Sequence, residues 1–273
     1  MIDYHGRFVW YELMTTDMAA AKMFYASVAG WGAQDASTPR MAYALFTVGK
    51  AFVSGLVGLS EDARRLGATP RWIGYVGVDD VDAAVDRVKR GGGAVHVAPT
   101  DVSDLSRFSI VADPQMASLA LIKWLRPNQQ SADLGKPGRV GWHELLSTDL
   151  DKAFAFYAEL FDWQKADADA GPVGTYQLFS AAGQTIGGMF TMPPTVSIPF
   201  WLYYFNVGDI DVAAERVRAG GGRVVEGPLE LPGGSWIVRC MDPEGAMFAL
   251  EGKRNPNAVG YFARVASRGR LPA

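Results

Sequence analysis

An alternation of apolar and polar residues marks the first ordered segment of the chain. Residues 8–14 follow the two-residue period of a strand with one buried face. Asp17 comes soon afterwards and indicates a helix start, because its side-chain oxygen can accept hydrogen bonds from the free amides of a first turn. Apolar side chains then recur at helical spacing over residues 19–28. The pattern predicts a strand that leads directly into a helix.

Further runs predict the remaining elements of the first half of the chain. Strands are expected at residues 42–48, 52–59, 72–78, 95–97, 108–111 and 119–124, and a second helix at residues 81–90. Glycines at 91–93 follow this helix and indicate its end, since a residue with positive φ commonly closes a helix.

The second half of the chain repeats the first. Residues 6–17 return as residues 138–149, with Trp-Tyr-Glu-Leu in the first copy and Trp-His-Glu-Leu in the second. Phe-Tyr, Gly-Gly-Gly and Asp-Pro also recur in the same order, at 24–25 and 156–157, 91–93 and 220–222, and 113–114 and 242–243. Ordered matches over this length indicate two copies of one structural module.

The repeat predicts the domain organisation. Residues 1–125 form the first module and residues 138–252 the second. The polar, proline-bearing segment 126–137 is interpreted as a linker. A basic tail at residues 253–273 is interpreted as a solvated end, with an arm that packs on a partner protein as the alternative.

Two half-motifs recur within each module, and they carry a family resemblance. One is a strand followed by Thr-Asp, a helix and Phe-Tyr, and the other is Asp-Val-Asp or Asp-Ile-Asp, a helix, three glycines and Asp-Pro between strands. Over residues 6–125 and 138–252 the chain resembles the vicinal-oxygen-chelate superfamily of glyoxalases, bleomycin-resistance proteins and extradiol dioxygenases. The resemblance implies an α+β fold of tandem βαβββ modules, whose curved mixed sheets surround a cavity.

The resemblance also implies where a divalent metal would sit. Enzymes of the family carry His, Gln or Glu ligands on the first and last strands of a half. The corresponding positions here hold residues that cannot coordinate a metal, namely Trp10, Ile73 and Ala120 in one module and Trp142, Leu202 and Ala249 in the other. No cofactor is therefore expected. The alternative is a divalent metal near His143 and Glu144, which requires a bulge to turn His143 toward Trp142.

Because the resemblance implies that Trp10 and Trp142 face the cavity, strand alternation predicts the rest of its lining, which is an aromatic, mostly apolar pocket with two facing glutamates. The expected ligand-binding residues are Trp10, Glu12, Tyr75, Trp142, Glu144, Tyr204 and Met247. Glu12 and Glu144 are also the catalytic candidates, because a partly buried carboxylate has a raised pKa and suits a general base. A purely structural interpretation pairs each glutamate with a nearby arginine, for which the candidates are Arg7, Arg71 and Arg139.

Composition narrows the class of protein. The 273 residues are 49 % hydrophobic and 20 % charged, with a formal net charge of −3, which is typical of a soluble globular protein. No basic domain suggests nucleic acid, and no apolar run approaches the ~20 residues of a membrane span. Cys240 is the only cysteine and is expected to be buried. A cytoplasmic monomer or homodimer with a small-molecule ligand is expected.

The first functional hypothesis is a metal-free small-molecule binding protein of the glyoxalase/bleomycin-resistance type, which acts in resistance or detoxification. The alternative is a glyoxalase-like lyase or isomerase that uses Glu12 or Glu144, with a dioxygenase as a weaker variant. A third hypothesis is an interaction protein whose surface or basic tail binds another protein. The residues leave open whether the chain is an enzyme.

Overall fold

The computed structural model describes residues 4–39, 41–125, 135–171 and 174–255. Its first half forms β1 (Phe8–Thr15), α1 (Met18–Ala29), β2 (Gly32–Asp35), β3 (Tyr43–Val48), β4 (Ala51–Gly58), α2 (Glu61–Arg65), β5 (Arg71–Gly77), α3 (Val81–Arg90), β6 (Ala94–Val102), β7 (Ser106–Ala112) and β8 (Ser118–Trp124). Its second half forms β9 (Val140–Ser147), α4 (Leu150–Phe161), β10 (Gln164–Gly171), β11 (Gly174–Ala181), β12 (Gln184–Thr191), β13 (Phe200–Asp209), α5 (Ile210–Ala219), β14 (Arg223–Glu230), β15 (Trp236–Met241) and β16 (Met247–Lys253).

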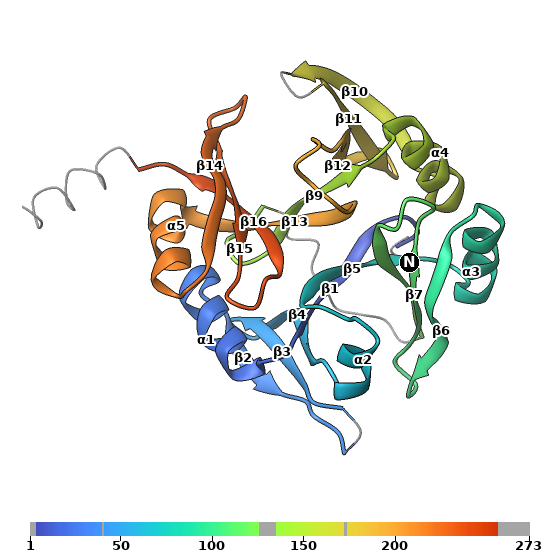
Figure 1. Cartoon of the computed structure of the whole chain (residues 1–273), viewed down its shortest axis with the longest axis horizontal. Helices are drawn as coiled ribbons and strands as arrows, with labels where there is room; N and C mark the ends of the chain where they lie inside the picture. The colour runs from blue at the N-terminus through green and yellow to red at the C-terminus, as the bar shows by residue number, and fades with distance from the viewer. Residues whose placement is uncertain (1–3, 40, 126–134, 172–173, 256–273) are drawn as a thin grey trace, which may run out of the picture.

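Each half of the chain builds one eight-stranded mixed sheet. The strand orders are β2-β3-β4-β1-β5-β8-β7-β6 and β10-β11-β12-β9-β13-β16-β15-β14, so the second sheet repeats the first. β1 pairs with β4 in parallel and with β5 antiparallel, and this β1–β5 pair joins the two halves of a module. Each sheet curves so that its outer strands face each other (Figure 1). The predicted α+β fold of two tandem modules with curved mixed sheets is confirmed.

The helices that were predicted from caps and periodicity lie close to their expected bounds. Asp17 accepts hydrogen bonds from the backbone amides of Ala19 and Ala20, both at 2.9 Å, and caps α1. The second predicted helix has the expected residues 81–90. Strand β2 and the short helix α2 were missed, because neither has a buried residue and so neither leaves an apolar pattern in the sequence.

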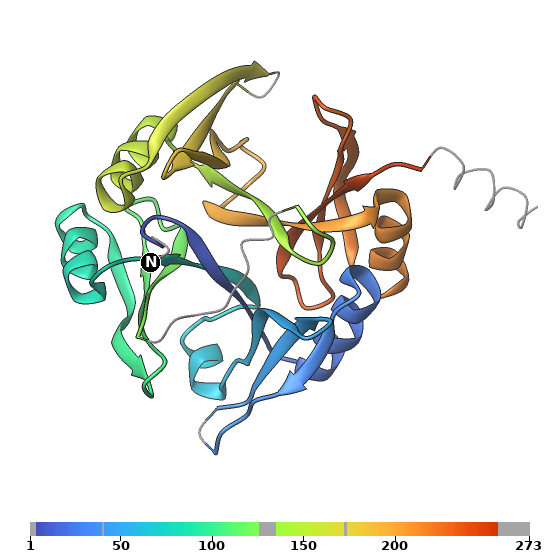
Figure 2. The same cartoon turned by 180° about the vertical axis from the view of Figure 1, so that it is seen from behind.

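The largest hydrophobic core lies between the two modules. There, α1 packs against α5 and α3 packs against α4, so each helix contact joins one module to the other. Figure 2 shows the same pairing from behind. Cys240 is completely buried in this core, as expected, and burial raises the pKa of its thiol to about 12.

Hydrogen bonds from Tyr25 and Tyr157 join the two modules to each other. Tyr25 Oη donates to Asp242 Oδ2 at 3.0 Å and accepts a hydrogen bond from Trp72 Nε1 at 2.8 Å. The repeat supplies the reciprocal set, in which Tyr157 contacts Asp113 at 3.0 Å and Trp201 at 3.1 Å. The Asp-Pro turns that the sequence predicted therefore also anchor the neighbouring module. Both carboxylates are buried, so they depend on these donors and on backbone amides of their own turns.

Parts of the predicted organisation fall outside the described residues. Residues 126–134 of the expected linker and residues 256–273 of the basic tail are among these. Among the residues that the structure does describe, no helix is long and apolar enough to cross a membrane.

The two Asp-Pro turns differ at one strained position. Met116 has φ 79° where the repeat has Gly245 with φ 97°, so a side chain occupies left-handed backbone in the first module only. The left-handed conformation costs a non-glycine residue about 1–2 kcal/mol. Met116 is more than half exposed and recovers little of this cost by packing.

We expect Met116→Gly to increase the free energy of unfolding by about 0.5 kcal/mol, because relief of strain exceeds the entropic cost of glycine. The matched change Gly245→Met should lower it by about 1 kcal/mol. Chemical denaturation of the two variants and the parent protein measures both values. A loss of stability in Met116→Gly would show that the methionine side chain contributes more than its backbone costs.

Candidate ligand-binding cups

The inner face of the first sheet, here called the first cup, is lined mainly by apolar and aromatic side chains. Its buried cluster contains Trp10, Ile73, Tyr75, Ile110, Ala120 and Ile122. Partly exposed residues pack around this cluster, among them Met14, Leu45, Phe108 and Trp124. Because these surrounding side chains keep some exposure, part of the inner face reaches solvent, while the cluster at its centre is buried.

Strand register assigns residues to this face. Trp10 pairs with Tyr75 across β1 and β5, and Tyr75 pairs with Ala120 across β5 and β8. Glu12 is opposite Ile73. The tryptophan, isoleucine and alanine predicted at the family's metal positions therefore do lie together on the inner face, beside one carboxylate.

Neutral donors surround the Glu12 carboxylate in the first cup. Tyr75 Oη donates to it at 2.5 Å, Tyr43 Oη at 2.7 Å and Trp10 Nε1 at 3.4 Å. Burial raises the pKa of Glu12 above its ordinary value, and these three hydrogen bonds offset only part of that rise. The site therefore favours the protonated carboxyl more than water does.

A glycine allows the tyrosine to reach the carboxylate. A Cβ on Gly55 would lie 2.3 Å from Tyr43 Oη and 2.8 Å from Glu12 Cγ, so a larger residue would displace this pair. Gly188 provides the same space for Tyr176 in the second module. The same device therefore positions a tyrosine against each cup glutamate.

The inner face of the second sheet, here called the second cup, holds Glu144 in a different environment. Tyr204 Oη and Tyr176 Oη donate to its carboxylate at 2.9 and 3.1 Å. Arg239 Nη2 also donates to it, at 2.8 Å, and forms an ion pair that is mostly buried. The indole of Trp142 bonds to Tyr176 Oη rather than to the glutamate. The second cup thus contains a charge pair where the first contains neutral groups.

The arginine partners expected for the glutamates were wrong. Arg7 donates to Gln184, Arg71 to Thr69 and Arg139 to the carbonyl of Phe52. The observed partner, Arg239, was missed because the first module has Ile110 at the equivalent position and the repeat gave no signal there.

The prediction of one pocket with two facing glutamates was wrong, because each sheet curves around its own cluster and the predicted binding residues are divided between two cups. Trp10, Glu12 and Tyr75 lie in the first. Trp142, Glu144, Tyr204 and Met247 lie in the second, around a cluster of Leu146, Phe190, Leu202, Ile237 and Ala249. Tyr43 and Tyr176 were missed as contacts, although the repeat matched them to each other.

His143 lies outside both cups. It is buried between the modules, where Nδ1 donates to the carbonyl of Ile186 at 2.6 Å and Nε2 accepts from Tyr11 Oη at 2.6 Å. Burial lowers the pKa of His143 to about 4, so the neutral imidazole fits this pattern. Its neighbour Glu144 points to the opposite face of β9. The two side chains do not converge on one metal position, and no bulge turns His143 inward.

The residues in the cups do not fit the divalent metal that the fold family implies. Among the described residues, no group of three or more His, Cys, Asp or Glu side chains is placed to hold an ion. A divalent site needs several converging oxygen or imidazole lone pairs. Glu12 instead accepts from three donors, and Glu144 accepts from two tyrosines and Arg239.

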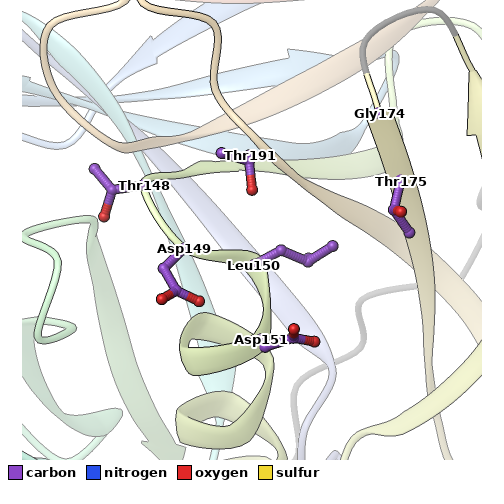
Figure 3. Close-up of a pocket in the computed structure, with 7 residues that line it drawn as sticks. All are labelled: Thr148, Asp149, Leu150, Asp151, Gly174, Thr175 and Thr191. Atoms are coloured by element: carbon purple, nitrogen blue, oxygen red, sulfur yellow. The ribbon is translucent and has the colours of Figure 1, made fainter.

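A separate hollow of about 380 Å³ lies at the start of α4. Figure 3 shows its lining, which consists of Thr148, Asp149, Leu150, Asp151, Gly174, Thr175 and Thr191. Asp149 is already engaged there as the cap of α4 and as the partner of Lys152. Neither cup glutamate borders this hollow, and the converging tyrosines and indoles lie in the cups.

Comparisons with known proteins agree with the fold. The family model of the Glyoxalase/Bleomycin resistance protein/Dioxygenase superfamily matches residues 7–121 and 139–250. A Mycobacterium tuberculosis protein provisionally named glyoxylase CFP32 is 34 % identical over 245 residues, which are 88 % of this chain and 92 % of that protein. The anthracycline biosynthesis protein DnrV of Streptomyces peucetius is 31 % identical over 273 residues, which are 93 % of this chain and 97 % of DnrV.

Solved structures share the fold at low sequence identity. The Mn(II)-bound glyoxalase of Novosphingobium aromaticivorans has a TM-score of 0.62 and 16 % identity, over 93 % of this chain and 84 % of that one. The 2,3-dioxygenase LapB of Pseudomonas sp. KL28 has a TM-score of 0.63 and 10 % identity, over 94 % of this chain and 96 % of that one.

The two cup glutamates should respond differently to removal of charge. The raised pKa of Glu12 means that its contribution to stability is largest below the ordinary value of 4.5 and is lost as pH rises through the higher folded value. Glu12→Gln carries no charge at any pH, so its stability relative to the parent should increase from pH 4.5 to pH 8.

Glu144→Gln should lower the free energy of unfolding by about 1–3 kcal/mol at pH 7, because Arg239 keeps a buried charge and loses a partner.

Urea unfolding of both variants at several pH values measures these effects. A Glu12→Gln difference that is the same at pH 4.5 and pH 8 would contradict the assigned environment of Glu12. A Glu144→Gln variant as stable as the parent protein at pH 7 would contradict the buried ion pair assigned to Arg239.

Proposed function

Because this chain belongs to the Glyoxalase/Bleomycin resistance protein/Dioxygenase superfamily, we propose that it is a metal-free small-molecule binding protein. The observation that carries the proposal is the Glu12 carboxyl, which three neutral donors hold within an aromatic, apolar face. Small-molecule sites have this character, with apolar walls and a few placed polar groups. The candidate binding residues are those predicted from the sequence, divided between the two cups, with Tyr43 added in the first cup and Tyr176 in the second.

A planar, largely apolar molecule with a hydroxyl group suits such a site. Indole and phenol rings offer flat surfaces, and the carboxyl of Glu12 can accept from a ligand hydroxyl or, when protonated, donate to a carbonyl. Two relatives that are named anthracycline biosynthesis proteins support an aromatic ligand. The role we propose is sequestration or handling of an aromatic compound, as in resistance or detoxification.

The proposal predicts binding without metal. Addition of 1,4-dihydroxyanthraquinone to protein dialysed against EDTA should quench the tryptophan fluorescence. The expected Kd lies between about 10 and 100 µM for a ligand of this size. Trp10→Leu should weaken binding because it removes a ring from the wall of the first cup. Failure of this probe to bind, or binding only after Mn²⁺, Ni²⁺ or Zn²⁺ is added, would contradict the proposal.

A glyoxalase-like lyase or isomerase is the second candidate, and one observation favours it. Burial raises the pKa of Glu12, and among the described residues no cation lies beside its carboxyl, which is the environment of many general acids and bases. The relative named as a glyoxylase points in the same direction.

Assays with methylglyoxal and glutathione, with and without divalent metal, test this candidate. It predicts turnover that Glu12→Gln or Glu144→Gln abolishes. An absence of turnover in the parent protein, or turnover that survives both changes, would exclude these glutamates as the base.

A further inference from the structure

The walls of the two cups are equivalent in position and opposite in chemistry. At four equivalent positions, β6, β7 and β8 carry apolar residues where β14, β15 and β16 carry charged ones. The equivalent pairs are Val97 and Glu226, Ile110 and Arg239, Ile122 and Glu251, and Trp124 and Lys253. The two modules therefore share one backbone arrangement and differ in the charge of these wall residues.

An ion network crosses the wall of the second cup. Arg239 donates to Glu144 at 2.8 Å and to Glu226 at 2.5 Å, and its guanidinium lies 5.7 Å from the centre of the Phe190 ring. A neutral aromatic ligand placed here would strip water from Arg239 and Glu226 and carries no charge to compensate for that loss. Burying charged groups in this way is costly, so the second cup disfavours such a ligand.

The wall of the first cup contains a buried hydrogen-bond donor, Trp124, at the position equivalent to Lys253. The indole of Trp124 packs against the first-cup cluster, and its Nε1 atom is buried. Within the described part of the chain, this N–H has no hydrogen-bond partner. Buried N–H groups are rarely left unpaired, and an indole nitrogen can only donate. A hydrogen-bond acceptor on a ligand in the first cup would supply the missing partner of this N–H.

We propose that the first cup alone is the ligand site, and that its ligand is a neutral aromatic carbonyl compound whose oxygen accepts from Trp124. This inference rests on the proposed binding function. Glu12 meets a polar group on the ligand, the apolar wall around Ile110 covers its ring, and Trp124 selects for the carbonyl. The second cup keeps the scaffold without this binding function.

Calorimetric titration with 1,4-dihydroxyanthraquinone tests the assignment of the cup. The expected stoichiometry is one probe per chain. Ile110→Arg, which copies the second cup into the first, should abolish binding. Glu226→Gln, a matched change in the second cup, should leave the affinity unchanged. Two equivalent sites per chain, or binding that survives Ile110→Arg, would overturn the inference while leaving the proposed binding function in place.

A second comparison tests Trp124 itself. Trp124→Phe keeps an aromatic ring and removes the N–H, so its affinity for 1,4-dihydroxyanthraquinone should fall about five- to tenfold, the value of one hydrogen bond. Its affinity for 2-naphthol, which has no carbonyl, should stay unchanged. Equal effects on both probes would show that Trp124 only shapes the wall, and no effect on either would show that it does not contact the ligand. A parent protein that binds neither probe would remove the proposed function itself.

Discussion

Alternation along β1 and β9 places neighbouring residues in two unrelated environments, and the rest of the structure depends on this. Glu12 and Glu144 face the cups, whereas Tyr11 and His143 face the core between the modules and bond to each other. A slip of one residue would exchange the two sets and bury the carboxylates between the modules. The inter-module contacts that fix this register therefore also fix the cups.

The sequence predicted features that depend on neighbouring residues, whereas it did not predict side-chain partners that lie far apart along the chain. Caps such as Asp17 and the helix at 81–90 followed from local pattern alone, because they depend on neighbours in sequence. The inward direction of Glu12 followed from the family resemblance together with strand alternation. The partner of Glu144 depends on a strand far along the chain, and the first module carries an isoleucine at that position. Exposed elements such as β2 leave no apolar period to detect. Long-range side-chain pairing was thus the main gap.

Duplication gave this chain two copies of one scaffold with different chemistry on each. The glycines that admit a tyrosine beside the glutamate are the same in both cups, so the position of the carboxylate is kept. Indole, isoleucine and alanine occupy the positions at which the family resemblance predicted metal ligands, and the Glu12 carboxylate accepts from three neutral donors. Fold likeness to a Mn(II)-bound glyoxalase and to a dioxygenase therefore coexists with cups whose residues do not fit a divalent metal.

The most direct test of this account is a crystal structure of the protein grown with 1,4-dihydroxyanthraquinone and a divalent metal such as Mn²⁺, with anomalous data collected for that metal. The account predicts planar density in the first cup, within hydrogen-bond distance of Glu12 and Trp124, and no anomalous peak in either cup. A metal ion bound to Glu12 or Glu144, or a probe seated in the second cup, would contradict it.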